Sequence, residues 1–174
     1  MDITFHPASE DPVLKAAAAE YQAIWKADGD AFVSVLETQA GLALPKLALN
    51  ALVFEGTSRS HPLILRASYS EEVKAATLVH ELGHRLLSAN GLRAEFGQDF
   101  HVVSHKLLYL FLFEVYSNLF GKERALQAVE WESNLRPSYR ECWNWALELG
   151  EAARARRFEQ IKQNRDEWLP YLNS

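Results

Sequence analysis

The stretch SYSEEVKAATLVHELGHRLLSANG, residues 68–91, has the pattern of an amphipathic helix with a signal at each end. Ser68 and Glu71 stand in the register of a capping box, and Ser70 is an alternative cap. Gly91 follows Asn90 as a stop signal. The stretch therefore predicts one long helix in the middle of the chain.

His80, Glu81 and His84 stand inside this predicted helix in the order H-E-x-x-H. Histidines four residues apart lie one turn apart on the same helix face, so His80 and His84 can bind one ion. A catalytic zinc site has three protein ligands and leaves one position for water. Glu81 flanks the same face, where its carboxylate can take a proton from zinc-bound water as a general base. The spacing therefore predicts a Zn²⁺ site of a hydrolase.

The rest of the helix fits this interpretation. Val79, Leu82 and Leu86 form an apolar stripe that can pack while the histidines stay accessible. Gly83 is unfavourable inside a helix by about 1 kcal/mol relative to alanine, which indicates a close approach of another backbone or a ligand.

The segments before this helix predict two helices and a small sheet. Asp11 and Pro12 have the sequence of a helix start, with a first helix to about Lys26 and a second over 30–40 that ends at Gly41. The apolar runs LVF and LILR are short and lie between Gly, Ser and Pro, which predicts a sheet of two or three strands. These two runs span residues 52–54 and 63–66.

Everything beyond about residue 99 has helical patterning, with Gly121, Pro137 and Gly150 between the helices. The predicted fold class is α+β, mostly helical. A small sheet in the N-terminal half precedes the H-E-x-x-H helix and a helical C-terminal half. The late cluster of Arg154, Arg156 and Arg157 is expected to be a solvated face.

Composition narrows the classes of partner and compartment. The 174 residues are 48% hydrophobic and carry a net charge of −5, which disfavours nucleic acid as a partner. The single cysteine, Cys142, suits a reducing compartment and a buried apolar role. The N-terminus has no secretory pattern, and the most apolar run, residues 107–115, is too short to span a membrane. A cytoplasmic protein that does not enter a membrane is expected.

Residues 78–87 resemble the active-site helix of zincin metallopeptidases. The small size and the helical second half resemble the compact gluzincin-like peptidases called minigluzincins. Residues 105–121 are similar to small uncharacterised bacterial proteins that carry H-E-x-G-H. The metzincin extension is absent, because Leu87 and Asn90 replace its glycine and histidine.

The resemblance implies a single zincin-like metallopeptidase domain over 1–174. It implies hydrolysis of a peptide bond through a zinc-bound water activated by Glu81. It also implies a peptide or protein substrate that pairs with the strand expected at 61–69. The alternative function is a zincin-like protein whose metal site serves binding or regulation of a partner.

The third zinc ligand departs from the gluzincin pattern, in which a glutamate follows the second histidine by about twenty residues. Ser104 stands there, and His105 is next to it. His105 is the favoured ligand, and Glu114 is the alternative, either as ligand or as the group that orients a zinc-bound histidine. His101, Glu95 and Asp99 remain further candidates.

Peptide hydrolysis also needs a donor that stabilises the oxyanion. The candidates are Tyr109, Tyr116, Tyr139 and Arg140, and the sequence does not choose among them. His6 and His61 each precede a proline and are interpreted as turn residues.

Overall fold

The predicted central helix is α2, Glu71–Ala89. Ser70 provides its start, because the Ser70 hydroxyl accepts a hydrogen bond from the Val73 N–H at 3.4 Å. The Ser68 hydroxyl instead donates to the Glu55 carboxylate at 2.7 Å. Gly91 follows the helix with a φ of +77°, a conformation that favours glycine. Of the two caps left open by the sequence, the structure selects Ser70.

The structure is a computed structural model that describes residues 1–94 and 99–173. Its elements are mostly helices with one small sheet in the N-terminal half, which confirms the α+β class. The chain divides into two compact units, residues 1–86 and 87–174, and the boundary falls inside α2. Among the described residues, no helix has the length and apolarity needed to cross a membrane.

The sheet of the first unit has three parallel strands in the order β1-β2-β3. β2, Ala48–Phe54, includes the predicted run 52–54, and β3, Ile64–Arg66, covers all but the first residue of the predicted run 63–66. β1, Asp2–Pro7, is the strand that the sequence interpretation lacks, and it includes His6, which was assigned to a turn. In β1 the buried residues alternate with exposed ones, a signal too short to separate from a loop.

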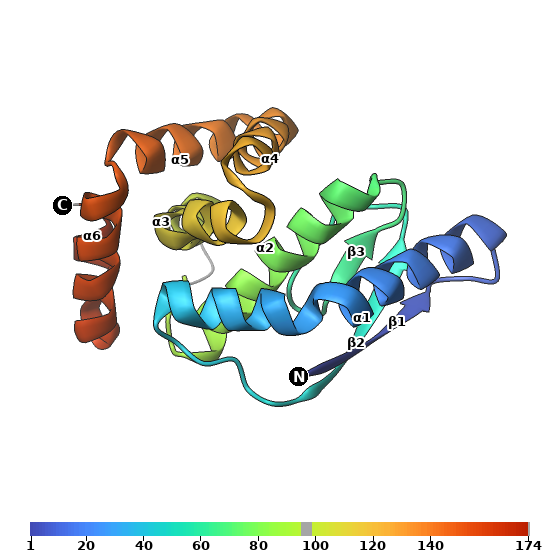
Figure 1. Ribbon diagram of the computed structural model, residues 1–174. Helices are drawn as coiled ribbons and strands as arrows, with labels where there is room; N and C mark the ends of the chain where they lie inside the picture. The colour runs from blue at the N-terminus through green and yellow to red at the C-terminus, as the bar shows by residue number, and fades with distance from the viewer. Residues whose placement is uncertain (95–98, 174) are drawn as a thin grey trace. The chain divides into compact units, whose positions relative to one another are not determined.

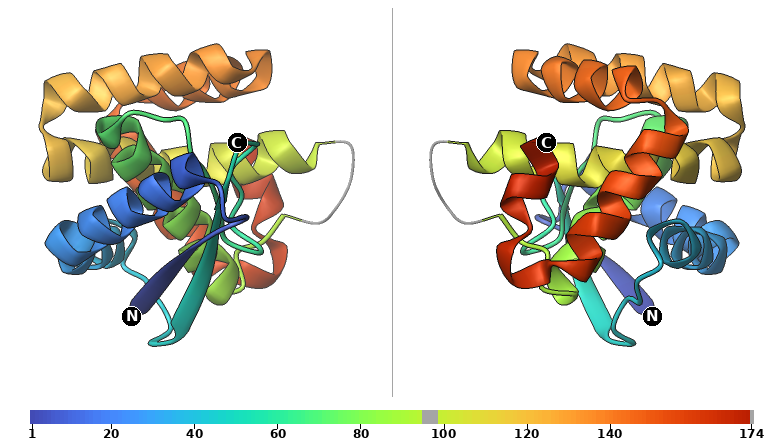
Figure 2. Two further views of the ribbon diagram at one scale, coloured as in Figure 1. Left: turned by 90° about the vertical axis from the view of Figure 1, so that its right-hand side faces the viewer. Right: turned by 90° about the vertical axis from the view of Figure 1, so that its left-hand side faces the viewer.

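Helix α1, Pro12–Ala40, packs across the sheet beside β1 and β2 (Figures 1 and 2). The Asp11 carboxylate accepts the Val13 N–H at 2.8 Å, and Gly41 ends the helix with a φ of +61°, as predicted. The predicted break near Gly29 is wrong, because α1 continues through it. Gly29 is buried, and a Cβ there would lie 2.7 Å from the indole ring of Trp25. Gly29 therefore makes room for Trp25 inside one helix.

Replacing Gly29 with alanine should destabilise the protein by about 1–3 kcal/mol, the usual range for overpacking a core. Helix propensity alone predicts the opposite sign, a gain of about 1 kcal/mol. The contact with the buried Trp25 ring decides the sign. Urea unfolding of Gly29→Ala measures it, with Asp28→Ala at the exposed neighbouring position as control. A more stable Gly29→Ala variant would contradict the assigned role of Gly29.

The second unit is helical, and α4 and α5 lie against α3 (Figure 2). Its helices agree with the predicted helical half and with the breaks at Gly121, Pro137 and Gly150. They are α3, Phe100–Phe120; α4, Lys122–Leu135; α5, Pro137–Glu148; α6, Glu151–Gln163; and α7, Leu169–Asn173, with a 3₁₀ turn at Arg165–Glu167.

Candidate metal site

The two histidines of the H-E-x-x-H motif face each other on α2. The Nε2 atoms of His80 and His84 are 3.1 Å apart, and the ring centroids are 4.9 Å apart. His80 is buried and His84 is half-buried. The apolar residues Val79, Leu82 and Leu86 are all fully buried, as the stripe predicts. Packing on those residues holds the histidines on a fixed helix face.

The separation of these nitrogens fits a shared metal ion. Two nitrogens bound to a tetrahedral zinc at about 2.0–2.1 Å lie about 3.3–3.4 Å apart. The 3.1 Å between the Nε2 atoms of His80 and His84 is close to that value. An ion could therefore bind to both rings with a small rotation of either side chain.

Glu81 is also buried, and its negative charge contributes to raising the pKa of two tyrosines of the first unit. Burial raises the pKa of the Tyr21 hydroxyl, and the negative charges of neighbouring residues, Glu81 among them, add to the increase. Burial likewise raises the pKa of Tyr69; the Arg66 guanidinium opposes this increase, and the charge of Glu81 adds a smaller one. The Tyr21 hydroxyl donates to the Arg66 carbonyl at 2.9 Å, at the end of β3. The electrostatic influence of Glu81 therefore extends to the end of the strand that precedes α2.

His105, the favoured third ligand, is buried in α3 of the second unit. Its Nδ1 lies 2.6 Å from the carbonyl oxygen of His101, one turn earlier. A carbonyl can only accept, so Nδ1 must carry the proton. In the neutral ring the lone pair is then on Nε2. This is the state in which metal-binding histidines are usually held, with the non-ligating nitrogen donating to a carbonyl or carboxylate.

Two tyrosine rings lie against the His105 imidazole. The Tyr139 ring is 4.2 Å away between centroids with an interplanar angle of 30°, and the Tyr109 ring meets it edge-on at 5.6 Å. With Nδ1 bonded to His101, the ring has few alternative orientations. His80, His84 and His105 make up a group that could hold a metal ion.

Glu114, the alternative ligand, has an ion-pair partner in its own unit. Its carboxylate pairs with the guanidinium of Arg154, which also donates to the Ala146 carbonyl at 3.0 Å. The Arg154 side chain is only 4% exposed. The expectation that Arg154 belongs to a solvated face is therefore wrong. The orienting role considered for Glu114 is filled at His105 by the His101 carbonyl.

The remaining ligand candidates differ in their surroundings. His101 is exposed; its backbone carbonyl accepts from His105 Nδ1, and its ring centroid lies 6.5 Å from that of His105. Asp99 stands directly before α3 without a side-chain capping bond. Glu95 lies outside the described residues. Cys142 is buried, and burial raises the pKa of its thiol to about 11, consistent with the expected apolar role.

The candidates for the oxyanion donor differ in burial: Tyr109 and Tyr116 are buried, whereas Tyr139 and Arg140 are accessible. The Tyr116 hydroxyl donates to Glu132 at 2.6 Å, and burial followed by the charge of Glu132 raises the pKa of Tyr109 well above its usual value. Arg140 is exposed and donates to the Asn134 side chain at 2.8 Å. Tyr139 is half-buried and its tilted ring lies against His105, so of the two candidates whose rings contact that proposed ligand, Tyr109 and Tyr139, it is the accessible one.

Other residues of the same chain form hydrogen bonds with the backbone groups on the outer edge of β3. Leu52 donates to the Leu63 carbonyl, and Ala67 donates to the Phe54 carbonyl, so Ile64 and Arg66 direct their backbone groups away from β2. These groups meet residues 58–60, here called the β3 strap, and one side chain of α1.

Four hydrogen bonds occupy this edge. Ile64 exchanges two backbone bonds of 2.9 Å with Arg59. The Arg66 N–H donates to the Ser58 hydroxyl at 3.1 Å, and the Arg66 carbonyl accepts from Tyr21. Arg85, next to His84, donates to the Ser60 carbonyl at 2.6 Å and ties the strap to α2. A peptide could pair with Ile64–Arg66 only after these bonds opened.

Sequence reasoning did not identify Tyr21, Arg85 or Glu132 as neighbours of the candidate residues. Arg85 follows His84 in sequence, but its bond to Ser60 spans 25 residues, and no local pattern marks this bond or the contacts of Tyr21 and Glu132. No family model matches the chain, and neither a curated protein nor a solved structure matches it.

Proposed function

We propose that the protein is a zinc-dependent metallopeptidase in which His80, His84 and His105 hold the ion. The observation that carries the proposal is the pair of Nε2 atoms 3.1 Å apart on α2, with Glu81 between the two histidines in sequence. The proton on Nδ1 of His105 supports its assignment as third ligand, because the neutral ring then has its lone pair on Nε2, the atom that would bind the ion. Three neutral imidazoles suit zinc among the common ions.

Each residue has a defined task in this proposal. Zinc, when bound, supplies a more acidic water and polarises the carbonyl of the substrate. Glu81 accepts the proton of the attacking water and delivers it to the leaving amine. The Tyr139 hydroxyl is the proposed donor to the developing oxyanion. His101 holds the His105 ring through its carbonyl.

Metal content of the purified protein tests the proposal first. Plasma mass spectrometry should find about one zinc per chain in the wild type, because three imidazoles and a water complete a tetrahedral site. His84→Ala and His105→Ala should lose that zinc, since each removes a ligand. Glu114→Ala should keep it, because the Glu114 carboxylate pairs with Arg154.

His101→Ala is the matched control on α3. It removes an exposed imidazole but keeps the carbonyl that contacts His105, so zinc should remain bound. Zinc lost with Glu114 and retained without His105 would establish the glutamate ligand instead. A wild type that binds no zinc after supplementation would overturn the proposal.

A second function has support from the β3 strap. The edge on which an extended peptide would add is occupied by Ser58 and Arg59 of the same chain. A metal site beside an edge closed in this way suits binding or regulation of a partner without turnover. Bound zinc together with no hydrolysis of a peptide library would favour this second function.

A further inference from the structure

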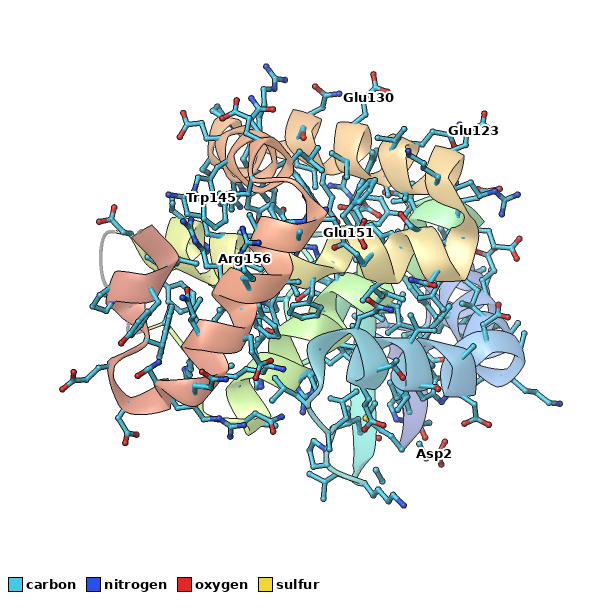
Figure 3. All side chains as sticks on the ribbon, turned by 60° about the vertical axis from the view of Figure 1, so that its left-hand side comes forward. Asp2, Glu123, Glu130, Trp145, Glu151 and Arg156 are labelled. Atoms are coloured by element: carbon cyan, nitrogen blue, oxygen red, sulfur yellow. The ribbon has the colours of Figure 1, made fainter. Side chains whose placement is uncertain are left out.

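Glu132 is a carboxylate in the interior of the second unit. Glu123 and Glu130 of the same helix, α4, point outward and are exposed (Figure 3). Glu132 is only 3% exposed. A buried carboxylate costs several kcal/mol unless hydrogen bonds compensate for the lost water, so its partners must matter to the structure.

The partners of Glu132 come from the two helices beside α4. The Tyr116 hydroxyl of α3 donates at 2.6 Å to one carboxylate oxygen. The Trp143 Nε1–H of α5 donates at 2.9 Å to the other. Charge-assisted bonds of this length are among the strong ones. Glu132 thus fixes one side chain of α3 and one of α5 relative to α4.

A series of ring contacts connects Trp143 to His105. Trp143 is fully buried and stacks on Tyr109, with the ring centroids 3.7 Å apart and an interplanar angle of 12°. Tyr109 in turn lies edge-on against the His105 ring at 5.6 Å. The second neighbour of His105 is Tyr139 of α5, whose tilted ring lies 4.2 Å from the His105 ring between centroids. Both tyrosines beside His105 depend on how α3 and α5 are held together.

We infer that Glu132 is a positioning residue for His105. By holding Trp143 and Tyr116, it sets the packing of Tyr109 and Tyr139 around the imidazole. The Nε2 atom of His105 is then aimed in one direction before a metal binds. The metal-binding part of this inference rests on the proposed function, whereas the orientation of the imidazole does not.

Glu132→Met tests the inference, because methionine keeps the length of the side chain but accepts no strong hydrogen bond. Zinc affinity, measured by competition with a chromophoric chelator, should fall about tenfold, as expected when groups outside the ligand shell are removed. The visible spectrum of the cobalt-substituted protein should change intensity. Glu132→Gln should restore most of the affinity, because its amide can accept from Trp143 and donate to the Tyr116 oxygen.

Phe158→Leu is the matched control. Phe158 of α6 is buried and packs on Phe111 of α3 at 4.9 Å, so its loss weakens α3 packing without touching the Glu132 contacts. Phe158→Leu should lower the melting temperature and leave zinc affinity unchanged. Equal losses of affinity in Phe158→Leu and Glu132→Met would overturn the inference in favour of general softening.

Nuclear magnetic resonance of the metal-free protein separates this inference from the proposed function. The His105 ring signals should shift in Glu132→Met, because Tyr109 and Tyr139 move, and unchanged signals would overturn the positioning role. If the wild type binds no zinc, the proposed function fails, and these signals still decide the role of Glu132. Should Glu132→Met not fold, Tyr116→Phe removes one of the two donors and should give a smaller shift in the same signals.

Discussion

Glu81→Gln should lower kcat/KM for peptide hydrolysis by about 10²- to 10⁴-fold while the protein retains its zinc. Glutamine has the shape of glutamate but cannot take a proton from the attacking water. The histidines proposed to bind the metal are unchanged, and glutamine has nearly the same volume as the buried Glu81 side chain that it replaces. Hydrolysis of a fluorogenic peptide library and metal content, measured on the same samples, give the two numbers.

Glu71→Gln is the control for this variant, since it makes the same change at an exposed position of α2. Its activity and metal content should match those of the wild type. Full activity in Glu81→Gln with zinc bound would eliminate Glu81 as the general base. Loss of zinc in Glu81→Gln would instead indicate that the carboxylate helps to hold the ion.

Glu114→Gln should lower the free energy of unfolding by about 3 kcal/mol, because it leaves the guanidinium of Arg154 buried without its counter-charge. Arg154 is 4% exposed and Glu114 is 19% exposed, so solvent screens the pair only weakly. The remaining bond from Arg154 to the Ala146 carbonyl does not neutralise the charge. Denaturant unfolding measures the loss.

The double variant Glu114→Gln with Arg154→Met should be more stable than Glu114→Gln alone, because no uncompensated charge then remains buried. A loss well below 1 kcal/mol in Glu114→Gln would show that the pair is hydrated in solution. Glu114→Gln should also keep its zinc, which separates this structural role from the ligand role that the sequence leaves open.

Local signals in the sequence predicted local structure well. The spacing of four between His80 and His84 is enough to place both rings on one face of α2, because helical geometry alone dictates it. Asp11 with Pro12 and Gly41 marked the ends of α1 correctly. The zinc, the hydrolysis and the peptide partner remain predictions, since they concern chemistry that no backbone pattern determines.

Contacts between residues far apart in the sequence could not be predicted from local patterns. Glu114 and Arg154 are 40 residues apart, and the sequence predicted a metal ligand or an orienting group for Glu114 and a solvated face for Arg154. The helix break predicted near Gly29 is wrong, because the sequence does not distinguish a glycine that makes room for an aromatic ring from a glycine that ends a helix. The proton position on His105 depends on a backbone carbonyl, which every residue type possesses.

The closed outer edge of β3 also has a consequence for the solubility of the folded chain. Exposed strand edges template pairing with other molecules and are a common route to aggregation. On this side of the sheet, Arg59, Ser58 and Tyr21 already bond the groups that an incoming strand would need. Fibril-like growth from β3 would therefore have to begin with local unfolding of residues 58–60.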